Sequence, residues 1–264
     1  MRIFIFKKRY IVSIFSIFFL FTVLFYAVSF LQDSPTLAVS LTQDYIVDED
    51  LQSKISALTK SEEKIAYLTF DDGPTLRATP RVLDILKEED VKATFFVIGK
   101  YVKSHPELVK RAYAEGHFIA NHGYDHSNQK LYQSEESFIN EVTSTDKEIA
   151  NALGLDDYCS HVFRFPNGFM SPNYHSKKRA AAKLLKDIGY VYVDWNCLNK
   201  DSEKKISNYQ LLNNFKKTTK NKGTLIILMH DTNDVNDTTA VLKESITYLK
   251  EQGYEFRNFY DFVQ

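Results

Sequence analysis

Leu68-Thr-Phe-Asp-Asp-Gly-Pro74 is the most informative stretch of this sequence. The apolar residues that lead into it predict a short buried strand, Ile65–Phe70. The strand ends at two carboxylates, Asp71 and Asp72, and the pair Gly73-Pro74 then forces the backbone to turn. Adjacent like charges at the end of an apolar strand call for a compensating cation. A solvated turn would explain the same residues, so the rest of the chain has to decide between the two interpretations.

Strand and helix patterns alternate from this point to the end of the chain. The predicted strands are Ile65–Phe70, Ala93–Ile98, Phe118–Asn121, Val162–Phe165, Tyr190–Trp195, Leu225–Met229 and Glu255–Phe256. The predicted helices are one that opens at Thr79-Pro80, then Pro106–Ala114, Ser134–Leu153, Lys177–Ile188, Asn208–Lys220 and Thr239–Gln252. Strands joined by helices pair in parallel through right-handed crossovers. Six or seven such units in roughly 200 residues predict a closed or nearly closed α/β barrel.

Reactive side chains gather where these predicted strands end, which is where parallel barrels carry their chemistry. They are Asp71 and Asp72, then His122 and His126, then Arg164, then Asp194, Trp195 and Asp201, and finally His230 and Asp231. Each of them taken alone has an ordinary explanation as a loop, turn or core residue. Five such groups on one rim together predict an active site.

The composition narrows the class of function. The 264 residues can hold one large domain, or one domain with an appendage. The formal net charge is -1, so no basic excess points to nucleic acid as a partner. Two cysteines, Cys159 and Cys197, are too few for a disulfide framework, and one bridge would be the maximum. We expect them at opposite ends of the sheet and therefore both free.

The N-terminal region predicts a membrane anchor. A basic segment, residues 1–10, precedes residues 11–31, which are 21 residues without a single charge and are rich in Phe, Ile, Leu and Val. That length matches the ~20 residues that cross a bilayer as a helix and exceeds the ~7–15 apolar residues of a signal peptide. A signal peptide cleaved after Ala27-Val-Ser29 is the alternative. Positive charge before the span and acidic residues after it predict a single-pass cell-membrane protein, with a cytoplasmic N-terminus and an extracellular catalytic domain.

Residues 32–63 are polar, with little periodicity apart from a possible short helix, Leu51–Leu58. They predict an extracellular linker that holds residues 64–264 away from the membrane. The alternative is a strap that packs on that domain.

Five motifs occur in a fixed order along the predicted domain. They are Thr69-Phe-Asp-Asp-Gly-Pro74, His122-Gly-Tyr-Asp-His126, Arg164-Phe-Pro-Asn-Gly168, Asp194-Trp195 with Asp201, and Leu228-Met-His230. They resemble the motifs of the polysaccharide deacetylases of the NodB-homology type, carbohydrate esterase family 4. The resemblance covers about residues 64–264. It implies a distorted (β/α) barrel of about seven strands that binds a divalent metal and removes acetyl groups from N-acetylated or O-acetylated sugars.

The resemblance also assigns roles to single residues. It implies that Asp72, His122 and His126 bind the metal, that Asp71 is the catalytic base and that His230 is the catalytic acid. One carboxylate and two imidazoles suit a catalytic Zn²⁺ site, although Co²⁺, Ni²⁺ or Fe²⁺ would be accepted too. A metal of this kind lowers the pKa of water and polarises an amide carbonyl.

Two further residues can support the acid and the base. Arg164 can pair with Asp71 and keep it ionised. Asp201 can hold the imidazole of His230 and raise its pKa. The family often has tryptophan where Ser202 stands in this chain, which leaves open whether Asp194 or Asp201 is the partner of the histidine.

Three residues are predicted to contact the substrate. The family pattern implies that the backbone N–H of Asn167 binds the oxyanion, although tyrosine is frequent at this position in the family. Trp195 and Leu228 are predicted to wall the pocket for the acetyl methyl group. Simple core packing would explain these last two residues equally well.

The sequence therefore predicts an anchored, metal-dependent N-deacetylase of cell-wall glycan, acting on N-acetylglucosamine of peptidoglycan. Its expected partners are the acetylated glycan and the membrane through residues 11–31, and we expect a monomer. The alternatives are the same chemistry on chitin oligomers, exopolysaccharide or O-acetyl xylan, and a wall-binding protein that has lost activity.

Overall fold

The computed structural model describes residues 51–203, 205–232 and 237–263. The predicted basic segment 1–10, the predicted membrane span 11–31 and the first part of the predicted linker lie outside these ranges. Within them, every helix is too short or too polar to cross a membrane. The boundaries of the predicted domains remain predictions.

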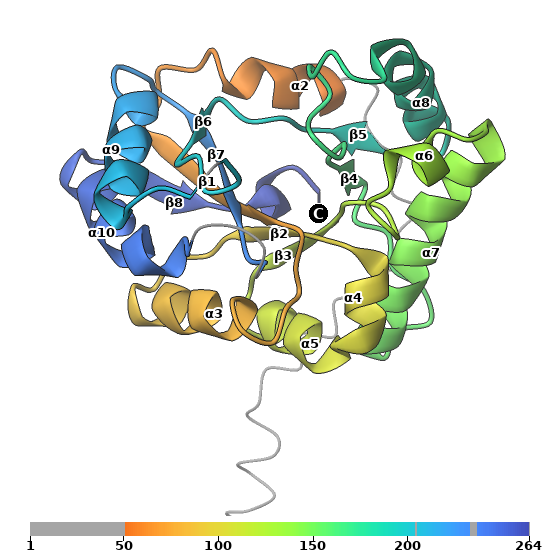
Figure 1. Cartoon of the computed structure of the whole chain (residues 1–264), viewed down its shortest axis with the longest axis horizontal. Helices are drawn as coiled ribbons and strands as arrows, with labels where there is room; N and C mark the ends of the chain where they lie inside the picture. The colour runs from red at the N-terminus through yellow and green to blue at the C-terminus, as the bar shows by residue number, and fades with distance from the viewer. Residues whose placement is uncertain (1–50, 204, 233–236, 264) are drawn as a thin grey trace, which may run out of the picture. The chain divides into compact units, whose positions relative to one another are not determined.

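A parallel sheet forms the centre of the described chain (Figure 1). Its strands are β1 (Ile65–Asp71), β2 (Thr94–Val97), β3 (Phe118–Asn121), β4 (Val162–Phe163), β5 (Val191–Tyr192), β6 (Cys197–Leu198), β7 (Leu225–His230) and β8 (Glu255–Arg257). Seven strands follow the order β5-β4-β3-β2-β1-β7-β6, and β8 pairs with the start of β1. The predicted strands are therefore all present, and β6 is a short strand that the sequence did not predict.

The sheet curls into a half-barrel of seven strands, which agrees with the predicted distorted α/β barrel of about seven strands, but its two edges do not meet, so the barrel is open rather than closed. Its edge strands are β5 and β6, and no pairing joins them in the part of the chain that the structure describes. Only residues 193–196 separate these two strands, whereas two neighbouring parallel strands need a crossover of a dozen or more residues. The chain therefore crosses the open side of the sheet directly, and β6 pairs with β7 at the far edge.

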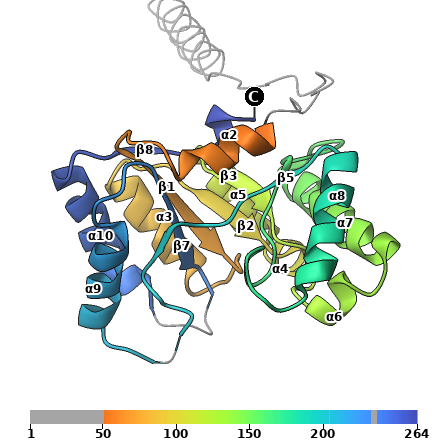
Figure 2. The same ribbon diagram turned by 90° about the horizontal axis from the view of Figure 1, so that it is seen from above.

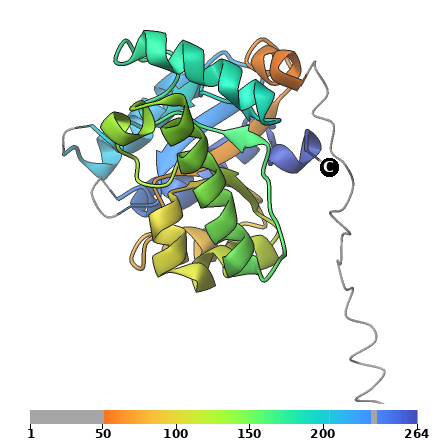
Figure 3. The ribbon, with the colours of Figure 1, turned by 90° about the vertical axis from the view of Figure 1, so that its right-hand side faces the viewer.

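Most of the helices cover the outside of this sheet (Figure 1), and α8 runs beside α7 on one flank (Figure 3). The helices are α2 (Leu51–Leu58), α3 (Thr79–Glu88), α4 (Gly99–Ser104), α5 (Pro106–Ala114), α6 (Asn128–Leu131), α7 (Glu135–Leu153), α8 (His175–Asp187), α9 (Asn208–Thr219) and α10 (Thr239–Glu251), followed by the short 3-10 helix η1 (Phe259–Asp261). The sequence did not predict α4, α6 or η1. Each of them has six residues or fewer, which is too short for a helical period to show.

Strand β1 shows how the sequence separates the two faces of the sheet. Ala66, Leu68 and Phe70 lie in the core beneath the helices. The alternate residues, which include Thr69 and Asp71, face the inside of the half-barrel because side chains alternate along a strand. The single carboxylate at the end of β1 therefore points inward, where the structure can use it.

The inside of the half-barrel is apolar at the amino ends of the strands. Tyr67 and Phe96 pack there against Phe259 of η1, with ring centroids 5.4 Å and 6.3 Å apart. Helix α2 and the C-terminal residues cover this end, and the loops at the carboxyl ends of the strands lie on the opposite side (Figure 2). The polar residues of the rim thus rest on an apolar floor that excludes water from below.

Helix α2 packs on the domain, as the strap alternative describes. Leu51 and Ile55 are buried in the core that lines the inside of the sheet. The side chain of Gln52 accepts a hydrogen bond from the backbone N–H of Tyr192 at 2.9 Å and donates one to its carbonyl at 3.1 Å. Gln52 therefore pairs with edge strand β5 much as another strand would.

The two cysteines are both free, as predicted: Cys159 is exposed and Cys197 is buried. No disulfide therefore links the predicted strand ends that carry these two residues.

A polar network ties α7 to the sheet behind the rim. The carboxyl group of Asp146 accepts hydrogen bonds from Asn121 at 2.9 Å and from the hydroxyl of Tyr190 at 2.6 Å. Burial of this carboxyl group raises its pKa to about 7, although the two hydrogen bonds oppose the shift. Between about pH 4 and pH 7, Asp146 is therefore protonated in the folded chain and ionised in the unfolded chain.

We predict that Asp146 makes the stability of the protein depend on pH. Its stabilising effect is complete below about pH 4 and is lost as the pH rises through about 7, because the folded pKa lies above the unfolded one. Asp146→Asn keeps the neutral form, so its stability relative to the wild type should increase from pH 5 to pH 8. Urea unfolding at the two pH values measures this. The exposed Asp187→Asn is the control, and an equal difference at both pH values for Asp146→Asn would contradict the prediction.

Candidate active site and metal centre

The turn after β1 separates the two aspartates. Asp71 still belongs to the strand, whereas Asp72 adopts a left-handed backbone with φ of 71°. A Cβ atom on Gly73 would lie 2.2 Å from Oδ2 of Asp231, so only glycine fits there. Asp231 is buried, and its Oδ2 accepts a hydrogen bond from Thr79 at 2.6 Å. It therefore supports the turn, and Asp71 and Asp72 can point to different neighbours.

Asp72 lies against both histidines of the second motif. Its Oδ1 is 3.4 Å from Nε2 of His122 and 3.2 Å from Nε2 of His126. This oxygen is buried but makes no hydrogen bond of good geometry among the described residues. Burial alone would raise the pKa of Asp72, but the neighbouring histidines outweigh burial and lower it.

These three residues fit a metal ion. Their candidate ligand atoms all lie within 4.8 Å of one another. Tetrahedral Zn²⁺ with ligands at its usual bond lengths separates two ligand atoms by about 3.3 to 3.4 Å, close to the two distances above. An orphaned buried carboxylate oxygen between two imidazoles is best explained by a cation that all three side chains share. Asp72, His122 and His126 therefore form a possible metal-binding triad, as predicted.

His122 is held in the orientation that a metal ligand needs. The ring is buried, and its Nδ1 lies 2.7 Å from the carbonyl oxygen of Arg164. Since a carbonyl can only accept, Nδ1 carries the proton and Nε2 keeps its lone pair for the ion. The half-buried His126 completes the triad from the end of the same loop, where its φ is 57°.

Arg164 also holds Asp71. Its guanidinium is fully buried and donates hydrogen bonds to Oδ1 of Asp71 at 2.9 Å and to the hydroxyl of Thr69 at 2.6 Å. The same group lies 4.0 Å from the centroid of the Phe96 ring. The other carboxylate oxygen of Asp71 is 3.8 Å from Nε2 of His122. Asp71 therefore stands beside the triad as a fixed carboxylate, in the place predicted for the base.

His230, the last residue of β7, lies on the other side of Asp72. Its Nδ1 lies 2.7 Å from Oδ1 of Asp201, and its backbone N–H donates to Oδ2 at 2.8 Å. Burial lowers the pKa of His230, but the bond and the charge of Asp201 outweigh burial and raise it to about 9. The other ring nitrogen, Nε2, is 4.0 Å from Oδ2 of Asp72. Asp201, and not Asp194, is therefore the partner of this histidine.

Asp194 instead shapes the loop after β4. Its carboxylate accepts hydrogen bonds from the backbone N–H groups of Phe169 at 2.8 Å and Met170 at 3.1 Å. The buried Lys178 donates to the carbonyl oxygen of Gly168 at 2.5 Å. These bonds fix the turn that contains Asn167, whose φ is 63°.

The three predicted substrate residues lie toward the carboxyl ends of the strands, where Asn167 follows β4, Trp195 follows β5 and Leu228 belongs to β7. Within the described ranges, the backbone N–H of Asn167 makes no hydrogen bond, so it is free to bind an oxyanion. Trp195 packs against Gly168, where a Cβ atom would lie 2.8 Å from the indole ring. Leu228 is buried and is paired in register with Thr69. It lies two residues before His230 on β7, so the two side chains share one face of the strand. The roles of these three residues remain predictions.

Two supporting residues were missed from the sequence. Thr69 binds Arg164, and alternation along β1 could have revealed it because it shares a face with Asp71. The hydroxyl of Thr238 donates to Oδ2 of Asp201. No spacing rule links these two loops, so Thr238 could not have been found without coordinates.

The comparisons with known proteins agree with this geometry. A family model described as polysaccharide deacetylase matches residues 59–193, just over half of the chain. A peptidoglycan-N-acetylglucosamine deacetylase from Bacillus cereus is 33% identical over 240 residues, which are 86% of this chain and 84% of that protein. Listeria monocytogenes PgdA, a protein of the same description, is 37% identical over 198 residues, 75% of this chain. The chain therefore belongs to the polysaccharide deacetylase family.

A solved structure supports the fold. The CE4 esterase from Streptococcus mutans superposes with a TM-score of 0.70 at 28% identity, covering 78% of this chain and 90% of that one. Several curated relatives are longer than the matched region, and the chain spans only 38% to 66% of their length.

We predict that removal of Arg164 destabilises the protein strongly. Arg164→Met leaves Asp71 as a buried charge without its partner, which should lower the free energy of unfolding by about 3–5 kcal/mol. Urea unfolding of the metal-free protein measures the loss. The double variant Asp71→Asn/Arg164→Met should recover part of it, since no unpaired charge then stays buried. A loss below about 1 kcal/mol in Arg164→Met would show that the pair does not matter for stability.

Proposed function

We propose that this protein is a metal-dependent hydrolase that removes N-acetyl groups from N-acetylglucosamine residues of peptidoglycan. The observation that carries the proposal is the convergence of the triad of Asp72, His122 and His126 with Asp71 and His230. Relatives described as peptidoglycan-N-acetylglucosamine deacetylases support this choice of substrate.

The triad would hold a divalent cation, with Zn²⁺ favoured by the ligand set and Co²⁺, Ni²⁺ or Fe²⁺ as alternatives. When bound, such an ion polarises the amide carbonyl and lowers the pKa of water.

The side chains of the protein then supply the proton transfers. Asp71, kept in place by Arg164, accepts the proton of the attacking water. His230, charged and oriented by Asp201, donates a proton to the departing amine nitrogen. The N–H of Asn167 donates to the oxyanion that forms on the carbonyl oxygen. Acid and base approach from different strands, so they can serve opposite sides of one amide.

We also propose that residues 11–31 anchor the protein in the cell membrane and that the catalytic domain lies outside the cell. The support is the uncharged length of this segment and the basic residues before it. A domain held at the outer surface would meet the cell wall as its substrate.

The rivals differ in substrate or in activity. The same chemistry on chitin oligomers, exopolysaccharide or O-acetyl xylan would use the same residues. A wall-binding protein without activity would not need an intact set of ligands, acid and base, and here the whole set is present.

We predict that the full chain, purified in mild detergent with Zn²⁺, releases acetate and exposes new free amines on peptidoglycan. Removal of the metal with a chelator should stop the release, and added Zn²⁺ should restore it. Chitin oligomers and acetyl xylan serve as parallel substrates and should release less acetate. Glycan binding without acetate release from any of them would instead support the inactive wall-binding protein.

We predict that two histidine variants separate the acid from the metal ligand. His230→Ala should still bind about one equivalent of Zn²⁺ but lose roughly 10²–10⁴-fold in turnover, the usual contribution of a general acid. His126→Ala should lose the metal because one of three ligands is gone. Metal content and acetate release are measured together on both variants. Turnover of His230→Ala at the wild-type level would remove this residue from the acid role.

A further inference from the structure

Two metal ligands of the proposed site lie on one short loop, His122–His126, which we call the histidine loop. Gly123 and His126 both have left-handed backbones, with φ of 81° and 57°. For the histidine such a conformation costs free energy and persists only where the surroundings hold it. The loop therefore needs specific contacts to keep both imidazoles near Asp72.

Part of this support comes from backbone bonds to α4. The N–H of Gly99 donates to the carbonyl oxygen of Gly123, and the N–H of Lys100 donates to that of Tyr124, each at 3.0 Å. Lys100 also pairs with Asp125 at 2.9 Å, but that pair is partly exposed, and such ion pairs contribute little. These contacts bind two carbonyl groups of the histidine loop and the side chain of Asp125. The backbone N–H groups of Tyr124 and Asp125, at the centre of the loop, need other acceptors.

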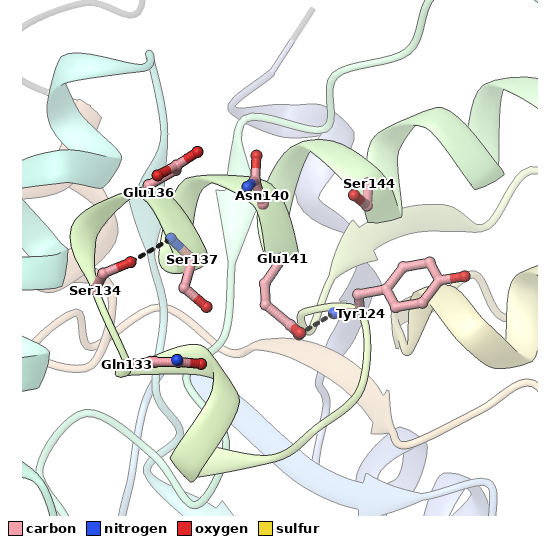
Figure 4. Close-up of a pocket in the computed structure, with 8 residues that line it drawn as sticks. All are labelled: Tyr124, Gln133, Ser134, Glu136, Ser137, Asn140, Glu141 and Ser144. Atoms are coloured by element: carbon pink, nitrogen blue, oxygen red, sulfur yellow. Dashed lines mark hydrogen bonds between the residues drawn. The ribbon is translucent and has the colours of Figure 1, made fainter.

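One carboxylate oxygen provides those acceptors. Oε2 of Glu141, on α7, accepts hydrogen bonds from the backbone N–H of Tyr124 at 2.8 Å and of Asp125 at 2.9 Å. Figure 4 shows Glu141 reaching from the helix to Tyr124 at the wall of a polar cavity. Water in this cavity can compete for the two N–H groups. Hydrogen bonds to an ionised acceptor are about twice as strong as neutral ones, so a carboxylate suits this position.

The position of Glu141 is itself fixed by the core. Its neighbour Val142 is fully buried, and so is Phe138 one turn before it. Thr145, one turn after Glu141, packs so closely on Gly99 that a Cβ atom there would lie 2.7 Å from its hydroxyl. Helix α7 therefore cannot shift without disturbing the core, and Glu141 transfers this rigidity to the histidine loop.

We infer that Glu141 is a positioning residue for the metal centre. It holds Tyr124 and Asp125 so that His122 and His126, on either side of them, stay close to Asp72. It is not one of the three candidate ligands. The inference rests on the metal site of the proposed function, and it adds a residue that lies outside all five motifs.

The test is the affinity of the metal-free full chain for Zn²⁺, measured by competition with a chelator of known affinity. Glu141→Ala should raise the Kd for Zn²⁺ by about 10–100-fold, as is usual for residues that orient metal ligands. Glu141→Gln keeps one acceptor oxygen and should lose less. Glu136→Gln is the matched control: it lies on the same helix and the same cavity, makes the same change of charge, and should leave the Kd unchanged.

Two further measurements distinguish positioning from general stability. The melting temperature of metal-free Glu141→Ala should stay close to that of Glu136→Gln, while the amides of Tyr124 and Asp125 exchange hydrogen faster. At saturating Zn²⁺ the variant should regain most of its turnover, because Asp71 and His230 are intact.

A Kd within twofold of the wild type in folded Glu141→Ala would overturn the inference. If that variant does not fold, Glu141→Ser, whose side chain is too short to reach the two N–H groups, takes its place, and a Kd within twofold of the wild type then overturns the inference. A different result would point to the proposed function itself: if His126→Ala binds Zn²⁺ as tightly as the wild type, the metal site is wrong.

Discussion

The rest of the site depends on the buried contact between Arg164 and Asp71. The guanidinium holds the carboxylate at 2.9 Å, while the backbone carbonyl of the same residue fixes the ring of His122. One residue thereby sets the position of the predicted base and the tautomer of a predicted metal ligand. A buried cation of this kind is tolerated because its donors are bonded and it rests on the ring of Phe96. The spacing between base and metal ligands is therefore built into the interior of the protein.

The fold could be predicted from the sequence where the elements are long and strongly patterned. Strand Phe118–Asn121 and helix Pro106–Ala114 have the predicted bounds, since clear apolar runs and a proline mark them. The open sheet could not be predicted, because it depends on the two-residue strand β6 and on which edge that strand joins. Such a choice is made by tertiary contacts and leaves no periodic pattern in the chain.

In the candidate site, too, some features could be predicted from the sequence and others needed coordinates. The motifs placed Asp72, His122, His126, Asp71 and His230 on one rim, and the structure brings them together. The choice between Asp194 and Asp201 needed coordinates, because both are carboxylates that follow the same predicted strand, Tyr190–Trp195, or lie at its end. Glu141 was not found either, since an acidic residue on a helix gives no sign of which backbone amides it will meet.

The pairing of Gln52 with edge strand β5 has a consequence for how the domain behaves in solution. An uncovered edge strand offers free N–H and C=O groups to any other chain, and such edges lead to aggregation. Here a side-chain amide occupies the N–H and C=O of Tyr192. A chain trimmed to begin at residue 64 would lose this cover and the two apolar side chains of α2, Leu51 and Ile55. A fragment whose edge strand β5 keeps this cover must therefore include α2, although the deacetylase motifs begin only after it.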